Sequence, residues 1–199
     1  DRSSKVYNKC ATFINYVVNQ SIKSTPTIKT ISNGQANKEK TKVIDGLIKY
    51  IQTSNNADTK YNRVLQDAVA GGIGVIKIDI VKKYGKDSIS IEHIKDPTCV
   101  YPDPTSQESD LSDAKWLFFV KSIPEKEFRK LYPEASLDIV AAKRKSWFSK
   151  DSVQIAEYWE QTEDGVVWYL LNGNEILDSS IIEETGENVY PGKCIPFAF

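Results

Sequence analysis

Three glycines interrupt an apolar segment, at Gly71, Gly72 and Gly74. A glycine loop that binds phosphate runs from a strand into a helix, because the amides at the start of the helix then point at the anion. Here a helical pattern precedes the glycines and a strand pattern follows them, and their spacing is not GxGxxG. The cluster therefore predicts a structural turn that ends a helix, where glycine adopts positive φ without strain. No cofactor site is expected.

His93 is the single histidine, and it lies in a strand-like alternation of apolar residues. A Ser-His or Cys-His nucleophilic site needs a partner for this imidazole, and no local pattern supplies one. A zinc site needs about three or four His or Cys ligands, whereas Cys10, Cys99 and Cys194 are far apart. We therefore expect no catalytic site and no metal site. We expect the cysteines to be reduced, mostly buried thiols in a cytosolic protein.

Carboxylates gather between Asp103 and Asp113, with Glu108 and Asp110 inside the segment. Hard cations such as Ca²⁺ and Mg²⁺ take carboxylate ligands, so a metal-binding module is one alternative function. The spacing differs from that of an EF-hand loop, and no glycine marks its centre. A solvated loop that contacts a neighbouring subunit is the favoured interpretation.

Basic and aromatic residues adjoin at Lys143, Arg144 and Lys145, followed by Trp147 and Phe148. Cations that bind phosphates, next to a ring that stacks on bases, are typical of single-strand binding. A nucleic-acid-binding module is therefore a second alternative, with the three cations as weak candidate DNA contacts. The favoured interpretation is a solvated helix end, where cations suit the helix dipole, followed by core aromatics.

Composition narrows the function classes. The chain has 199 residues and a net charge of −1, with 40% hydrophobic and 27% charged residues. This balance is typical of a globular protein and gives no overall attraction to DNA. No apolar run approaches the ~20 residues that span a bilayer, so we expect no membrane association.

Periodicity predicts helices first and antiparallel strands afterwards, an α+β class with inserted short helices. The change of period divides the chain into a mainly helical part, 1–74, and a β-rich part, 75–199. The start at Asp1 and the apolar, strand-like end at 194–199 favour a fragment of a longer protein. The predicted helices span residues 6–22, 38–51, 58–70, 123–132 and 137–145, and the predicted strands span 27–31, 75–81, 89–94, 116–120, 153–159, 166–171 and 175–177.

Several short segments follow one another in a distinctive order: LIKYI (47–51), NNADTKY (55–61), QDAVAGGIG (66–74), IKDP (94–97), VYPDP (100–104), SDAKW (112–116) and AEYW (156–159). This succession resembles the portal proteins of short-tailed, podovirus-type tailed bacteriophages, and it covers nearly the whole chain. No single segment is chemically decisive, and the order carries the resemblance.

The resemblance implies a subunit of a dodecameric ring at a unique capsid vertex, through which double-stranded DNA is packaged and ejected. It implies contacts with the major capsid and scaffolding proteins, a terminase and a tail adaptor protein, and no active site. The implied location is the virion, with assembly in the host cytoplasm. The chain would be the wing region, with the stem, clip and crown outside it.

Overall fold

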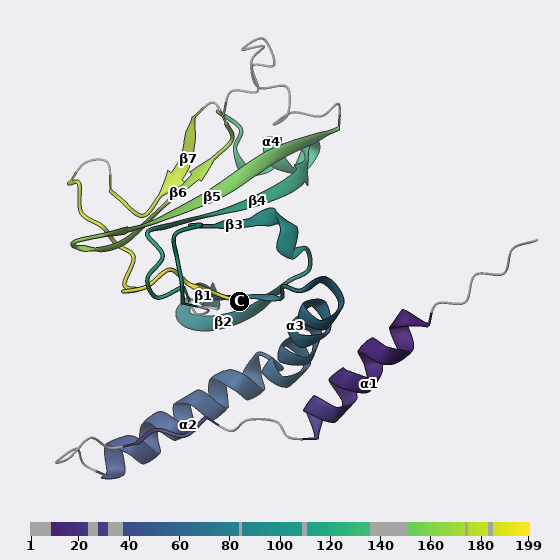
Figure 1. The fold of residues 1–199 in the computed structure, drawn as a ribbon. Coiled ribbons are helices and arrows are strands. Elements are labelled where there is room, and N and C mark those ends of the chain that lie inside the picture. The colour runs from purple at the N-terminus through teal and green to yellow at the C-terminus, as the bar shows by residue number, and fades with distance from the viewer. Residues whose placement is uncertain are drawn as a thin grey trace, which may run out of the picture. The chain divides into compact units, whose positions relative to one another are not determined.

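Helices come first along the chain and two antiparallel sheets follow (Figure 1). The predicted α+β class is thus confirmed by the computed structural model. Contacts divide the chain into two compact units: residues 1–97 with 197–199 form the first, and residues 98–196 form the second. The structure describes residues 9–23, 28–31, 38–83, 85–108, 111–135, 151–173, 175–182 and 185–199.

The boundary between the units lies at Pro97 and not at Gly74, where the sequence period changes. The first hairpin stays with the helices because α3 (Ala57–Gly71) packs against both of its strands, β1 (Val75–Lys83) and β2 (Lys86–Ile94). The short strand β8 (Phe197–Ala198) also returns to the first unit and pairs with β1. The helix-to-strand transition is therefore internal to one unit.

The helices of the first unit follow the predicted helical periods. They are α1 (Cys10–Ile22), α2 (Lys38–Ser54) and α3, and α1 packs on α3 (Figure 1). A two-residue turn joins α2 to α3, and Asn56 in it adopts φ 50°. Asparagine tolerates this left-handed conformation better than most residues. The turn sends the chain directly from one helix into the next.

The strand predicted for residues 27–31 is wrong over the described residues 28–31, which form neither strand nor helix. Thr30 instead bonds to α2: its N–H and its hydroxyl donate to Asp45 Oδ1 at 2.8 and 2.7 Å. The hydroxyl also lies 3.1 Å from the carbonyl oxygen of Thr41. A helix side chain therefore satisfies the backbone donor that a neighbouring strand would otherwise have paired.

Asn55 joins the helices to the edge of the first sheet, whose strand order is β2-β1-β8. Its side-chain amide donates to the carbonyls of Ile51 in α2 and Ile89 in β2, each at 2.9 Å. Its Oδ1 accepts from the N–H of Ile91 at 3.3 Å. Lys60 of α3 donates to the carbonyl of Ile91. Side chains of the α2–α3 turn and of α3 therefore pair the backbone groups that β2 would present as an open edge.

We predict that Asn55→Ala lowers the free energy of unfolding by about 3 kcal/mol, since Asn55 is only 7% exposed and its loss leaves the edge groups of β2 unpaired. Denaturant unfolding measures the change. Thr53→Ala, at an exposed position two residues earlier, is the matched control and should change stability by less than about 0.5 kcal/mol. Equal effects of the two changes would show that the Asn55 side chain does not stabilise the contact between the helices and β2.

The second unit is built on a five-stranded antiparallel sheet with the order β3-β4-β5-β6-β7. The pairing follows chain order, so each strand joins its neighbour without a crossover. Its longest ladder pairs β4 with β5 along nine residues of β4, from Trp116↔Glu160 to Pro124↔Ser152. The strands are β3 (Val100–Pro102), β4 (Trp116–Pro124), β5 (Ser152–Thr162), β6 (Gly165–Leu171) and β7 (Ile176–Ser179).

A short helix, α4 (Glu125–Leu131), follows β4 and covers one face of this sheet. Its Phe128 is 0% exposed and packs against Val153, Ile155 and Leu170 of β5 and β6. Burying a phenylalanine side chain contributes about 2 to 3 kcal/mol. The second unit thus contains a hydrophobic core of its own.

The cysteines differ from the prediction of mostly buried thiols. Cys10 and Cys194 are exposed, and Cys99 is partly exposed. Trp159 is buried, and its ring centroid lies 6.1 Å from that of Trp168. The helix predicted for 137–145 lies outside the described residues.

Candidate functional site

The glycine cluster forms the turn between α3 and β1. Helix α3 ends at Gly71, and Gly72 follows in the left-handed conformation with φ 87°. The N–H of Gly72 donates to the carbonyl of Ala68 at 2.8 Å, which closes the helix. At Gly74 an added Cβ would lie 2.2 Å from the carbonyl oxygen of Val64. The glycines therefore serve a turn and a close approach of strand to helix.

The three glycines should respond differently to alanine. Gly74→Ala is expected to cost about 3 kcal/mol because its Cβ would overlap the backbone of Val64. Gly72→Ala should cost about 1 kcal/mol from its positive φ alone. Gly71→Ala should stabilise by roughly 0.5 kcal/mol, since this helical site has open space around it. Thermal and denaturant unfolding would check the order, and a Gly74→Ala protein as stable as Gly71→Ala would contradict it.

His93 has a partner that no local sequence pattern indicated. Its Nε2 lies 2.5 Å from Asp67 Oδ2 on α3, a residue 26 positions earlier. The two side chains are 12% and 31% exposed, so the contact is largely shielded from water. The pair ties α3 to the end of β2, and only the folded packing of helix on strand brings it together.

The carboxylates of the acidic loop are engaged by the loop itself. Asp103 is 4% exposed, and its oxygens accept from the N–H and hydroxyl of Thr105 and from the N–H of Lys115. Asp113 accepts from the hydroxyl of Ser106 and from the N–H of Gln107. Asp103 is therefore a buried turn residue, which corrects its prediction as part of a solvated loop. Asp110 lies outside the described residues.

These hydrogen bonds have an electrostatic consequence. Those from the Thr105 hydroxyl and amide lower the pKa of Asp103 below its ordinary value of 3.8. Those from Gln107 and Ser106 lower the pKa of Asp113 in the same way. Within the described parts of the chain, no group of three or more His, Cys, Asp and Glu side chains is arranged to hold a metal ion. The loop geometry thus assigns these two carboxylates to turns.

A carboxylate with a lowered native pKa stabilises the fold above its ordinary pKa, and this stabilisation disappears as the pH falls through the native value. We therefore predict that Asp103→Asn lowers stability at pH 7 and flattens the loss of stability below about pH 3.8. Urea unfolding between pH 2 and pH 7 measures both effects. Asp87→Asn, at an exposed hairpin position, is the control and should leave the curve unchanged. An unchanged curve for Asp103→Asn would refute the role of this carboxylate.

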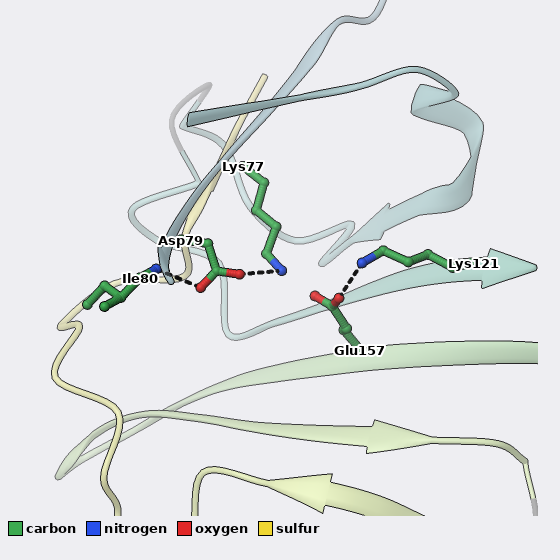
Figure 2. Close-up of polar contacts among 5 residues, drawn as sticks. All are labelled: Lys77, Asp79, Ile80, Lys121 and Glu157. Atoms are coloured by element: carbon green, nitrogen blue, oxygen red, sulfur yellow. Dashed lines mark hydrogen bonds and ion pairs between the residues drawn. The ribbon is translucent and has the colours of Figure 1, made fainter. Parts of the chain in front are cut away.

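Two further ion pairs hold lysines against the sheets (Figure 2). In the first unit, Lys77 Nζ lies 3.0 Å from Asp79 Oδ2, and Asp79 Oδ1 accepts from the N–H of Ile80. In the second unit, Lys121 Nζ of β4 lies 2.6 Å from Glu157 Oε1 of β5. The Lys77 side chain is only 5% exposed, so its pairing offsets the cost of burying the charge. Both pairs thus have structural roles.

The weak candidate DNA contacts Lys143, Arg144 and Lys145 lie outside the described residues. Among the described helices, none combines the length and apolar composition needed to cross a bilayer.

The most unusual surface of the first unit is apolar. Helix α1 buries only Val18, and α2 buries no side chain completely. Isolated helices of this length are marginal in water and normally depend on packing of an apolar face. We call the exposed residues of these two helices the apolar stripes; they are Phe13, Tyr16, Val17 and Ile22 on α1, and Val43, Ile44, Leu47 and Tyr50 on α2. Exposed apolar surface of this extent is typical of a protein contact site.

Comparison with known proteins identifies the family of the chain. The model of the phage P22-like portal protein family matches residues 2–192. The chain belongs to this family. The portal protein of Acyrthosiphon pisum secondary endosymbiont phage 1 is 25% identical over 176 residues, which cover 80% of this chain and 24% of that relative. The chain thus spans about a quarter of the length of its relative.

Membership of the P22-like portal family confirms the resemblance to phage portal proteins that the order of sequence segments predicted. The family is structural and not enzymatic, and its role is that of a phage portal. Among the polar side chains described above, His93 pairs with Asp67 of α3, whereas Asp103 and Asp113 bond to residues of their own loop.

Proposed function

We propose that the chain is the wing region of a longer portal subunit, and that twelve subunits form a ring at one capsid vertex. Double-stranded DNA is packaged and ejected through that ring. The subunits dock a terminase and a tail adaptor protein, and they contact the major capsid and scaffolding proteins during assembly in the host cytoplasm. The single observation that carries this proposal is the family match over residues 2–192.

The apolar stripes of α1 and α2 support the subunit contact in this proposal. Leu47 and Tyr50 are 55% and 70% exposed, and they lie one helical turn apart on α2. Large side chains at helical spacing bury well against another surface and gain about 25 cal/mol per Å² of apolar area. A neighbouring subunit would supply that surface.

The near-neutral net charge also supports the proposed passage of DNA through the ring. A protein surface that neutralises many phosphates binds DNA tightly and in a strongly salt-dependent way. A subunit with a net charge of −1 has no such overall attraction, so DNA is able to slide past it. The metal-binding alternative gains no support from the acidic loop, because the Asp103 and Asp113 carboxylates are engaged in turns. The cations of the nucleic-acid-binding alternative, Lys143, Arg144 and Lys145, lie outside the described residues.

The test compares the 199-residue chain with the longer subunit. We expect the 199-residue chain alone to be monomeric or weakly associated, and the longer subunit to form rings. Leu47→Glu and Tyr50→Glu in the longer subunit should weaken ring formation about tenfold or more, because a charge at a desolvated contact costs over 1.4 kcal/mol. Light scattering and native mass spectrometry measure both.

Lys49→Glu provides the matched control, since it adds acidic charge at an exposed α2 site between the two stripe residues. Circular dichroism should show that all three variants fold, because these side chains are exposed. A stable ring of twelve from the 199-residue chain would contradict the need for the missing regions. Normal rings from both stripe variants would exclude α2 from the subunit contact.

A further inference from the structure

An open groove of about 500 Å³ lies in the first unit, where α1 packs on α3 beside the end of β2. Its apolar wall includes Ile14 and Ala70. Its polar lining comes from all three elements and the residue after β2; the polar residues are Asn15, Arg63, Gln66, Asp67, His93 and Lys95. The groove is thus built by tertiary packing and not by one loop.

The acid and the imidazole in this groove are already paired. Asp67 Oδ2 lies 2.5 Å from His93 Nε2, so the only carboxylate of the lining faces the only imidazole. The pairing uses one of the two oxygens of Asp67. Within the described parts of the chain, neither Arg63 nor Lys95 has an acidic group within 4.0 Å.

The remaining polar side chains all carry hydrogen-bond donors, and none has a side-chain partner among the described residues. Arg63 and Lys95 supply charged N–H groups, and Asn15 and Gln66 supply amide N–H groups. Arginine provides a planar fork of donors that matches phosphate oxygens, and lysine provides a compact positive charge. The ligand that complements such a lining is an acceptor with negative charge.

Local charge strengthens this complementarity. Arg63 and Lys95 contribute two positive charges, and Asp67 contributes one negative charge, so the lining is positive whether or not His93 carries a proton. The whole chain has a net charge of −1, so this positive surface is a local feature. Anions are attracted to such a concave positive patch more strongly than to flat, solvated lysines.

We propose that this groove binds a phosphate group, held by Arg63 and Lys95 with amide contacts from Asn15 and Gln66. The apolar wall at Ile14 and Ala70 leaves room for the rest of a phosphate-bearing molecule. Binding joins α1 to α3, because the donors come from both helices. The proposal does not depend on ring formation, and it concerns a different face from the α2 stripe.

Pyrophosphate is the probe, and the 199-residue chain is the test protein. We expect saturable binding by isothermal titration calorimetry and a rise in melting temperature, as for any ligand that binds the folded state. The double variant Arg63→Gln, Lys95→Gln should bind at least about tenfold more weakly. Both side chains are exposed, so the variant should fold with the wild-type circular dichroism spectrum.

The matched control is the double variant Lys40→Gln, Lys49→Gln, which removes the same charge from exposed sites on α2. It should retain pyrophosphate binding. Equal losses of pyrophosphate affinity in the two double variants would show general charge attraction and would overturn the proposed binding site. The absence of saturable binding by the wild-type chain would overturn it as well.

A second arm identifies the source of the phosphate. A short DNA duplex that displaces pyrophosphate from the wild type, but does not bind the Arg63, Lys95 variant, would support recognition of a nucleic-acid backbone. Its affinity should then fall steeply with salt. Pyrophosphate binding without displacement by the duplex would support a small phosphate-bearing molecule.

Discussion

The first unit depends on one constraint: the backbone groups at the open edge of β2 need partners. The side-chain amide of Asn55 supplies two of them: it donates to the carbonyl of Ile89 and accepts from the N–H of Ile91. Lys60 adds a bond to the same strand, and Asp67 reaches His93 near its end. Because these side chains come from the α2–α3 turn and from α3, the same contacts fix the helices on the hairpin. The groove and the exposed face of α2 follow from that placement.

Much of the fold is encoded in local periodicity. Helical spacing predicted α2 and α3, and the change to alternation after Gly74 predicted β1 and its hairpin with β2. The apolar end of the chain was expected to be a strand, and β8 is one, although its partner β1 lies more than a hundred residues earlier. No local pattern specifies such a partner, because alternation fixes which residues share a face but not which strand lies alongside.

The polar contacts were less predictable for the same reason. Apolar and polar residues do alternate around Thr30 in the sequence. However, Asp45 accepts from the N–H and the hydroxyl of Thr30, and the described residues 28–31 form no strand. Asp67 and His93 are 26 residues apart on different elements, so their pairing depends on how α3 packs. The acidic loop suggested metal ligands because it is rich in carboxylates. In the structure, the backbone N–H groups of Thr105 and Lys115 donate to Asp103 instead. Composition indicates which groups are present and not which donors they meet.

The two units differ in how they obtain stability, and this difference bears on assembly. The second unit buries Phe128 against its own sheet and so carries its own core. In the first unit, α1 and α2 leave most of their large apolar side chains in water. A helix whose apolar face is exposed gains free energy only when another surface covers it. The first unit therefore has apolar surface from which a partner could still gain free energy, and this is why the subunit contact that we propose is placed on α2.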